Sequence, residues 1–368
     1  MGDFLVKNKK HIFIFLIFIS LASFADTIRK GLINGCDFQW QPAVLFWEGI
    51  NHYQKFISNG KSDFLCQGGE YGHLFNIILF PYTLVKWEIA RAFWVITNII
   101  FSIFIPLLIC KSLKLSKYKT LLLLLIFMTC YPTRMTINYG QQSLFVLFFL
   151  ILPFLYKSNL FSFLSGFASI KYSTGYIIYF NFLIKKQFKK FFLATIPYIL
   201  GWIIYALYTK SHIIINFFEP LDWSLNYKQY VRDADVYSLL QMYLIDSSQK
   251  YIKYFSIILV FILNLFFLIK INKLSDNFLK MSLILICPLI FFPHSNYDYV
   301  LLFPLACYSL KNFEILSNKI NFYFVIYFFY MSRQIKHLLD MDWLYQPILL
   351  SSLITLIFYN IKQNLKKN

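Results

Sequence analysis

The chain has 368 residues, of which 58% are hydrophobic, 21% are aromatic and only 14% are charged. Soluble domains carry about 25% charged residues, so this composition excludes a soluble globular protein and indicates an integral membrane protein. The formal net charge of +18 would suggest nucleic-acid binding in a soluble protein, but here apolar runs recur from end to end. No soluble-domain stretch and no flexible linker stands out, so we predict a single integral membrane domain over residues 1–368.

The apolar runs predict an all-α, polytopic helical bundle. A membrane-spanning helix needs about 20 apolar residues, or fewer when it is paired inside a bundle. We predict twelve spans: 12–25, 89–110, 121–131, 143–156, two short helices within 160–184 that meet near Lys171, 191–208, 251–269, 279–292, 300–310, 322–331 and 344–359. The first run resembles a signal peptide, but no convincing cleavage site precedes Asp37, so we expect a retained helix.

Basic residues set the predicted orientation. The segments assigned to the cytoplasm hold 20 Lys and Arg against three Asp and Glu, and the opposite side holds 15 against 14. This asymmetry follows the positive-inside rule. It predicts a multi-pass protein of the cell membrane whose two termini are cytoplasmic. The membrane we expect is a bacterial inner membrane. Two large extracytoplasmic loops then cover residues 26–87 and 209–250.

The first outer loop contains two runs that are typical of helices lying on the membrane surface. A short amphipathic run covers residues 47–54, and the apolar run 71–81 is short and bounded by a proline. We predict interfacial or re-entrant helices here. Cys36 and Cys66 both fall in this loop, where an oxidising compartment would permit a disulfide, but spacing alone does not show that they meet. The other four cysteines lie in or beside apolar runs and are predicted to be packing residues.

Four polar clusters are predicted to emerge on the outer side: Asp37, residues 134–141, Lys171 and residues 294–298. A carboxylate can act as general base towards a sugar hydroxyl, which contributes about 10²- to 10⁴-fold in rate. Cations such as Arg134 and Lys171 can stabilise a leaving phosphate. His294 can bind that phosphate or share the proton transfer. The tyrosines and tryptophans of the outer loops can stack on sugars.

Each cluster also has a purely structural interpretation. Asp37 can cap the helix that follows it, and Lys171 can extend its charge to the membrane interface, although charges within membranes usually have a function. His294 and Asp298 follow a proline at a helix end, where turn residues are expected. Arg134 can be a surface charge. No Gly-rich phosphate loop and no CxxC or HExxH spacing stands out, so we predict no metal and no cofactor.

Five motifs come in an order that resembles a known family. They are Gly35-Cys36-Asp37-Phe38, the segment from Trp47-Glu48-Gly49 to Tyr53, Tyr139-Gly140-Gln141-Gln142-Ser143-Leu144, Leu164-Ser165-Gly166-Phe167-Ala168-Ser169-Ile170-Lys171-Tyr172 and Pro293-His294-Ser295-Asn296-Tyr297-Asp298. Together they resemble glycosyltransferase family 87. Its members are membrane enzymes of the GT-C class, related to mannosyltransferases and arabinofuranosyltransferases of mycobacterial envelopes. The likeness covers most of the chain.

The resemblance implies a GT-C fold with a cavity on the outer face. That cavity would take a polyprenyl-phosphate sugar, with mannose or another hexose or pentose, and a lipid or glycan acceptor, and would transfer the sugar with inversion. The family's first-loop aspartate, buried lysine and late histidine fall on Asp37, Lys171 and His294, for which we predict catalytic roles at Asp37 and His294 and phosphate binding at Lys171. We predict phosphate binding by Arg134 from its charge alone. The predicted substrate-binding residues are Gln141, Asn296, Tyr297, Asp298, Tyr71 and His73. Where relatives often have Tyr-Pro-Pro, this chain has Tyr71-Gly72-His73, so the acceptor wall is expected to differ.

Two other functions compete with a transferase. A transporter or flippase of a lipid-linked glycan would want charges at mid-membrane and pseudo-symmetric halves, whereas no internal repeat is evident and the polar clusters gather on one face. A non-catalytic scaffold would leave the outer polar set unexplained. We therefore predict a hexosyltransferase-type enzyme that acts on lipid-borne substrates and binds membrane lipids but no nucleic acid.

Overall fold

The computed structural model describes residues 9–36, 38–59, 71–227, 235–244, 250–331 and 342–365. Within these ranges all regular secondary structure is helical, which confirms the all-α prediction. The helices are α2 (Lys9–Asn34), α3 (Trp40–Trp47), α4 (His52–Asn59), α5 (His73–Ile78), α6 (Phe80–Thr83), α7 (Trp87–Leu113), α8 (Lys117–Thr129), α9 (Tyr131–Tyr139), α10 (Ser143–Leu155), α11 (Asn159–Ser165), η2 (Gly166–Ile170), α12 (Tyr172–Gly175), α13 (Ile177–Ile184), α14 (Phe188–Tyr208), α15 (Ile213–Tyr227), α16 (Val236–Leu244), α17 (Lys250–Asn272), α18 (Asn277–Phe291), η3 (Asn296–Leu302), α19 (Phe303–Lys311), α20 (Leu316–Tyr330) and α22 (Asp342–Leu365).

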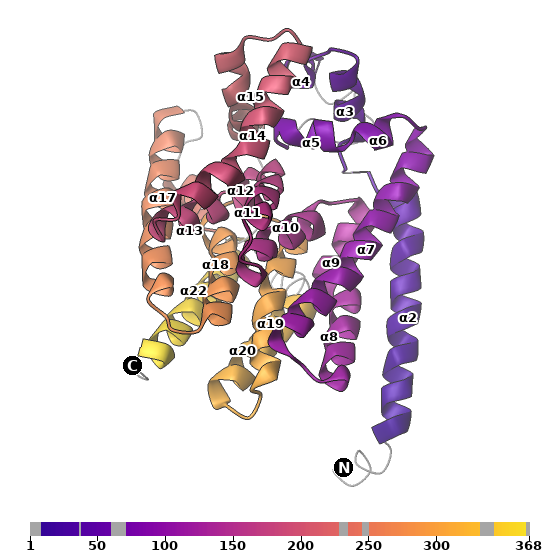
Figure 1. The fold of residues 1–368 in the computed structure, drawn as a ribbon, viewed down its shortest axis with the longest axis vertical. Coiled ribbons are helices and arrows are strands. Elements are labelled where there is room, and N and C mark those ends of the chain that lie inside the picture. The colour runs from indigo at the N-terminus through magenta and orange to yellow at the C-terminus, as the bar shows by residue number, and fades with distance from the viewer. Residues whose placement is uncertain are drawn as a thin grey trace.

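The helices form an upright bundle with a cap at one end (Figure 1). The short helices α3 to α6 and the helix α15 lie in the cap at the upper end of this view. The start of α2 and the end of α22 both lie at the lower end. The polar segments around Lys171 and between α18 and η3 lie beneath the cap, so the cap covers the region in which the sequence places its candidate site.

Three of the described helices are long and apolar enough to cross a membrane. They are α7, α14 and the Phe255–Asn272 part of α17. A fourth span is possible only if α8 and α9 count together, and these two are bent by 50° at their junction. Each of the twelve predicted apolar runs falls on helical structure, but a count of twelve spanning helices is not confirmed. Helices such as α10 and α18 are apolar but span about 20 Å, which is short of a bilayer core.

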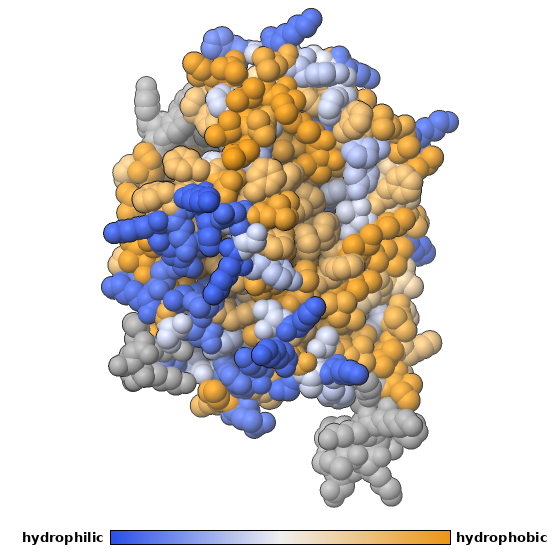
Figure 2. All heavy atoms as spheres, in the orientation of Figure 1, coloured by the Kyte–Doolittle hydropathy of each residue, from blue (hydrophilic) through white to orange (hydrophobic). Residues whose placement is uncertain are grey.

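The long helices turn apolar side chains outward. On α7 the exposed large hydrophobic residues recur every three or four positions: Ile89, Phe93, Ile96, Ile100, Phe104 and Leu107. A helix in a soluble protein hides such a stripe against its core, so exposed stripes of this size indicate apolar surroundings. Figure 2 shows the broad apolar surface of this face, with hydrophilic side chains gathered mainly at the lower left and at the upper rim. The chain is therefore a membrane-associated protein.

Two segment boundaries differ from the prediction. Helix α2 continues to Asn34, nine residues past the predicted end of the first span, because Asp26 pairs with Arg29 and Lys30 on the helix surface and keeps the polar end helical. Residues 209–250, predicted as a polar loop, contain α15 and α16. By contrast, the predicted short helices of the first outer loop are present as α3, α4, α5 and α6.

The segment predicted as two short helices meeting near Lys171 has that form. Helix η2 ends at Ile170 and α12 begins at Tyr172, while Lys171 between them has an extended backbone with φ −112° and ψ 97°. Two glycines allow the close packing that holds this break. A Cβ atom at Gly175 would lie 2.4 Å from the Ala168 carbonyl oxygen, and one at Gly166 would lie 2.1 Å from the Ala194 carbonyl oxygen of α14. The break at Lys171 is therefore fixed against α14.

Candidate functional site

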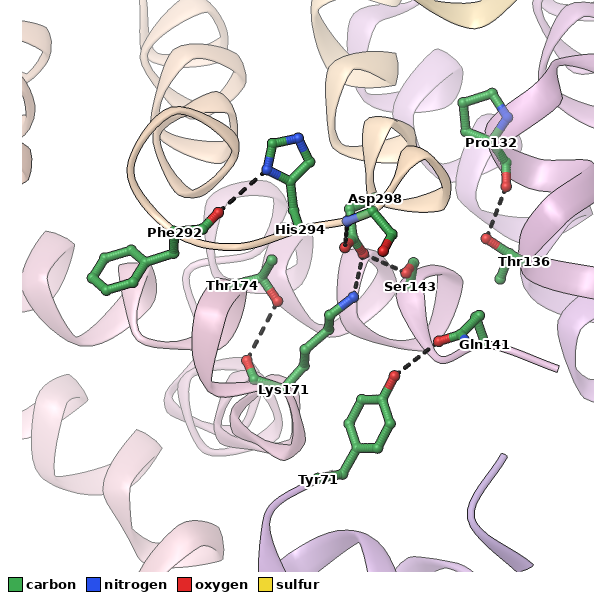
Figure 3. Close-up of polar contacts among 11 residues, drawn as sticks. Tyr71, Pro132, Thr136, Gln141, Ser143, Lys171, Thr174, Phe292, His294 and Asp298 are labelled. Carbon is green, nitrogen blue, oxygen red and sulfur yellow. Dashed lines mark hydrogen bonds and ion pairs between the residues drawn. The ribbon is translucent and has the colours of Figure 1, made fainter. Parts of the chain in front are cut away.

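Lys171 forms a buried ion pair with Asp298. The Lys171 Nζ atom lies 2.5 Å from Asp298 Oδ1, and the two side chains are 11% and 2% exposed. The lysine comes from the break between η2 and α12 and the aspartate from the first turn of η3, so the pair joins segments 127 residues apart (Figure 3). Lys171 thus points into the protein towards a carboxylate, and its charge is not extended to a membrane interface.

Two serines hold the aspartate in place. Ser143, the first residue of α10, donates its hydroxyl to Asp298 Oδ1 at 2.5 Å, and the Ser295 backbone N–H donates to Oδ2 at 3.1 Å. Asp298 and Ser295 form a reciprocal capping box at the start of η3. Burial would raise the pKa of Asp298, but the charge of Lys171 and the hydrogen bonds from Lys171, Ser143 and Ser295 together lower it. Asp298 is therefore a carboxylate at neutral pH.

Residues from the first outer loop lie close to this pair. The Tyr71 hydroxyl donates to Gln141 Oε1 at 2.8 Å, two residues before Ser143 in the chain (Figure 3). The Gly72 N–H donates to the Ile170 carbonyl at 2.9 Å, directly before Lys171. These two bonds tie the start of the cap to both sides of the ion pair. The arrangement places a tyrosine, an amide side chain and a lysine at the junction of cap and bundle.

The turn after α18 supplies the remaining side of the site. The Lys171 ammonium lies over the Tyr297 ring, 4.8 Å from its centre, which is within range of a cation–π interaction. His294 is buried, and its Nδ1 lies 3.2 Å from the Phe292 carbonyl oxygen, while its Nε2 has no hydrogen-bond partner within the described chain. Burial lowers the pKa of His294 to about 4, so its imidazole is neutral at pH 7. The Asn296 side-chain oxygen is also buried and has no hydrogen-bond partner within the described chain.

Two predicted site residues lie elsewhere. Arg134 on α9 donates through Nε to Thr27 on α2 at 3.2 Å, so its described contact is with the first helix and not with Lys171 or Asp298. His73 at the start of α5 is packed among rings, 4.7 Å from the Tyr205 ring centre and 5.4 Å from that of Tyr53. These two residues are therefore not part of the ion-pair cluster.

The proposed catalytic base lies outside the described residues. Helix α3 begins at Trp40, with Gln39 as its N-cap residue in the left-handed region at φ 63°. Asp37 itself is not described, so its position relative to Lys171 stays a prediction. Cys36 is disulfide-bonded, and Cys66, its predicted partner, also lies outside the described part of the chain. Cys110, Cys130, Cys287 and Cys307 are free and buried, as expected of packing residues.

Sequence reasoning missed two features of this end of the molecule. Ser143 was seen only as the start of a span, although its place two residues after Gln141 could have marked it as a polar group at a helix end. The second feature is the buried carboxylate of Glu219 on α15, which accepts hydrogen bonds from three amides: Asn51, Gln54 and Asn216. No spacing rule in the sequence connects α4 to α15.

The described residues contain no group of three or more His, Cys, Asp or Glu side chains that could hold a metal ion. What they offer is a cation with a fixed carboxylate partner, aromatic faces and polar side chains, gathered from four distant segments. Fold and site together define a class: an all-helical, membrane-associated protein with a charged polar site at one end of its bundle.

Comparison with known proteins narrows the class. The model of glycosyltransferase family 87 matches residues 71–293, more than half of the 368-residue chain. The chain therefore belongs to glycosyltransferase family 87, as its motifs suggested, and this membership indicates glycosyltransferase activity. The matched range contains Tyr71, Gln141 and Lys171 and ends one residue before His294. No curated protein and no solved structure matches the chain.

Proposed function

We propose that this glycosyltransferase takes its sugar from a polyprenyl-phosphate donor and transfers it with inversion to a lipid or glycan acceptor on the extracytoplasmic face. The observation that carries the proposal is the buried Lys171 ammonium within the family match, held by Asp298 beneath the cap. A phosphate monoanion or dianion needs a positioned cation as its sugar bond breaks. A lysine set in a helix break is suited to that task.

The proposed reaction has one bond-forming and one bond-breaking event. The acceptor hydroxyl oxygen attacks the anomeric carbon, and the bond from that carbon to the phosphate oxygen breaks with its electron pair on the phosphate. Asp37 takes the hydroxyl proton as general base. Lys171 donates a hydrogen bond to the departing phosphate, since an ammonium group has three N–H donors and can serve Asp298 and a phosphate together.

Neighbouring residues have supporting roles in this proposal. Neutral His294 donates through Nδ1 to the Phe292 carbonyl, so its buried Nε2 carries a lone pair and can accept a hydrogen bond from a sugar hydroxyl of the donor without adding charge. Tyr297 and Tyr71 can stack on the sugar, and Gln141 and Asn296 can bind its hydroxyls. Asp298 holds Lys171 in position. The contact of Arg134 with Thr27 favours Lys171 over Arg134 as the cation that meets the phosphate.

The proposal includes a membrane arrangement. We place the cap on the extracytoplasmic side and both termini in the cytoplasm of a bacterial inner membrane, with about twelve crossings in a GT-C arrangement. Two observations support this placement: the start of α2 and the end of α22 lie at the same end of the bundle, opposite the cap (Figure 1), and lysines concentrate in the segments assigned to that end.

The decisive test uses the full chain reconstituted in liposomes with radiolabelled polyprenyl-phosphate sugars, nucleotide sugars in a parallel reaction, and a lipid extract as acceptor. We expect label to move to a new product with release of polyprenyl phosphate, and no reaction from nucleotide sugars. Translocation of intact donor without bond breakage would instead establish a flippase. If neither transfer nor translocation is observed, the protein is a non-catalytic scaffold.

A pair of matched variants tests the base. Asp37→Asn should abolish transfer while expression and donor binding persist, because asparagine cannot accept the hydroxyl proton. The control is Asp26→Asn, which removes an acidic residue of similar chain position whose partners are the helix-surface residues Arg29 and Lys30. An active Asp37→Asn enzyme would refute the proposed base.

A further inference from the structure

The first half of helix α15, residues 213–220, has its polar and apolar faces reversed. Asn216 and Glu219 are buried at 0% and 6% exposure, whereas Ile214, Ile215 and Phe218 are 61%, 59% and 48% exposed. A surface helix in water shows the opposite pattern, with its apolar stripe facing the protein. The helix lies in the segment that the sequence assigned to a polar extracytoplasmic loop, so its outward face needs an explanation.

The buried Glu219 carboxylate accepts all its described hydrogen bonds from side chains of the protein. Glu219 Oε1 accepts from Asn51 and Gln54 of the α3–α4 region at 3.0 and 2.7 Å, and Oε2 accepts from Asn51 at 2.9 Å and Asn216 at 3.0 Å. Both carboxylate oxygens therefore have two amide donors each. These hydrogen bonds offset part of the cost of removing the carboxylate from water, while the Asn216 side-chain oxygen is buried without a partner among the described residues.

Helix α15 also folds back along a span. The Trp202 indole N–H of α14 donates to the Ile213 carbonyl at 2.8 Å. The Phe217 ring of α15 lies 4.8 Å from that of Trp202 and 6.1 Å from that of Tyr198. Because α14 ends at Tyr208 and rises about 1.5 Å per residue, Tyr198 lies about 15 Å below its upper end. Helix α15 thus runs beside the upper half of α14.

The exposed apolar surface continues from one helix to the other. On α14 the exposed large hydrophobic residues of the upper half are Ile199, Leu200, Ile204, Leu207 and Tyr208. The turn at residues 209–212 then leads to Ile214 and Ile215 on α15, which are also exposed. With 15 residues, α15 is about 22 Å long and too short to cross a bilayer core.

We propose that α15 is a re-entrant helix whose outward face contacts the acyl chains of the outer leaflet. Together with α14 it forms a helical hairpin inserted from the extracytoplasmic side, and its Glu219 cluster is sealed between lipid-facing helices. The continuity of its apolar face with that of α14 favours lipid over a protein partner. The proposal rests on the crossing of α14 proposed above, and does not depend on the sugar donor.

Site-directed spin labelling of the full chain in liposomes tests this directly. Nitroxides are placed by Ile215→Cys on α15, by Ile199→Cys on α14 as lipid-facing reference, and by His212→Cys in the exposed turn as aqueous reference. Ile214→Cys replaces the first label if that variant does not fold. Labelling of the unsubstituted chain corrects for the native thiols. The readout is the ratio of collision rates with oxygen, which concentrates in lipid, and with a water-soluble nickel chelate.

We expect the ratio at position 215 to match that at 199 and to exceed that at 212 by at least about tenfold. A ratio at 215 equal to that at 212 would place α15 in water and overturn the proposal. Low collision rates with both reagents at 215 would show that protein covers the face, as in a complex with a second copy of the chain, and would also overturn it. A water-like ratio at 199 would instead refute the crossing of α14, a separate failure.

Discussion

Two buried carboxylates at the same end of the molecule, Asp298 and Glu219, have opposite kinds of partners. Asp298 faces a cation, Lys171, at a break between short helices, and that cation lies against the Tyr297 ring. Among the described residues, Glu219 accepts hydrogen bonds from the neutral amides of Asn51, Gln54 and Asn216. The first arrangement pairs two opposite charges, and the second surrounds one charge with neutral amides; both join segments that are distant in the chain.

The difference separates a site from a structural clamp. A lysine held by a carboxylate can still meet an incoming anion, since attraction and hydrogen-bonding capacity persist. A carboxylate whose two oxygens already accept four hydrogen bonds from three amides gains little from a ligand. We therefore assign ligand chemistry to the Lys171 cluster and assign to Glu219 the structural role of joining α4 to α15 within the cap.

The largest expected effect comes from breaking the ion pair on one side. Lys171→Met leaves the Asp298 carboxylate buried without its cation and should lower the free energy of unfolding by about 3–5 kcal/mol. Lys171→Met with Asp298→Asn removes both charges and should recover most of that loss. Thermal unfolding in detergent measures both variants. A double variant as unstable as the single one would contradict the assignment of the loss to the unpaired carboxylate.

The clamp is tested by Glu219→Gln. Either orientation of the glutamine puts its NH₂ group against amide donors that the carboxylate accepted, so we expect a loss of about 1–3 kcal/mol in stability. Transfer per folded molecule should not change, because the residue is structural in this account. Glu48→Gln, at an exposed residue, is the matched control for stability. Loss of turnover in a folded Glu219→Gln protein would show that Glu219 also contributes to the reaction and is not purely structural.

Ser143→Ala tests the hydrogen bond from Ser143 to Asp298. It removes a hydroxyl that donates to Asp298 at 2.5 Å, and a hydrogen bond to a charged group contributes about 1.5–3 kcal/mol. Since Asp298 keeps Lys171 and the Ser295 N–H, we expect the lower end of that range in stability and a modest rise in KM for the donor. Ser143→Thr should rescue both measurements. Failure of threonine to rescue would point to packing at the start of α10.

Counted per histidine and per pH unit, the smallest effect expected is a pH dependence from three buried histidines. Burial lowers the pKa of His294 to about 4 and that of His73 to about 3, and it lowers the pKa of His52 well below the ordinary value. Each is neutral in the folded chain, whereas the unfolded chain takes up a proton below about pH 6.5. Stability is therefore complete above pH 6.5 and falls on acidification towards pH 4, by about 1 kcal/mol per pH unit for each histidine.

Unfolding temperatures measured over that pH interval check the slope. His73→Phe should reduce it, because phenylalanine keeps the ring contacts with Tyr53 and Tyr205 and cannot take up a proton. His212→Asn, in an exposed turn, should leave it unchanged. An equal slope in the His73 variant would contradict its burial in the neutral form.

The sequence predicted the helices better than their contacts. Apolar length and lysine positions were enough to locate the break at Lys171 and to place Lys171 and Asp298 on the same side. They could not show that the two residues pair, since 127 residues separate them and either could have bound something else. Arg134, which the sequence grouped with Lys171, lies against Thr27 because α9 packs on α2.

The reversed helix α15 shows where pattern reasoning fails for a physical reason. Asn216 and Glu219 looked like loop residues because polar residues usually face water, and the three consecutive isoleucines at 213–215 were too few to predict a span. Only the structure shows that the amides of Asn51 and Gln54 donate hydrogen bonds to Glu219. With its polar residues bonded inside the protein, the helix can place its apolar side chains on the outside. Tertiary hydrogen bonding of this kind leaves no periodic signal.

The most direct test of the central claim is sugar transfer by the Lys171→Met, Asp298→Asn double variant, in which the charge pair is absent and the fold is expected to persist. With radiolabelled polyprenyl-phosphate sugar as donor, transfer per folded molecule should fall by at least about 100-fold relative to the unsubstituted enzyme. Lys189→Met, at an exposed residue of α14, should transfer normally. Unreduced transfer by the folded double variant would show that Lys171 does not serve the leaving phosphate.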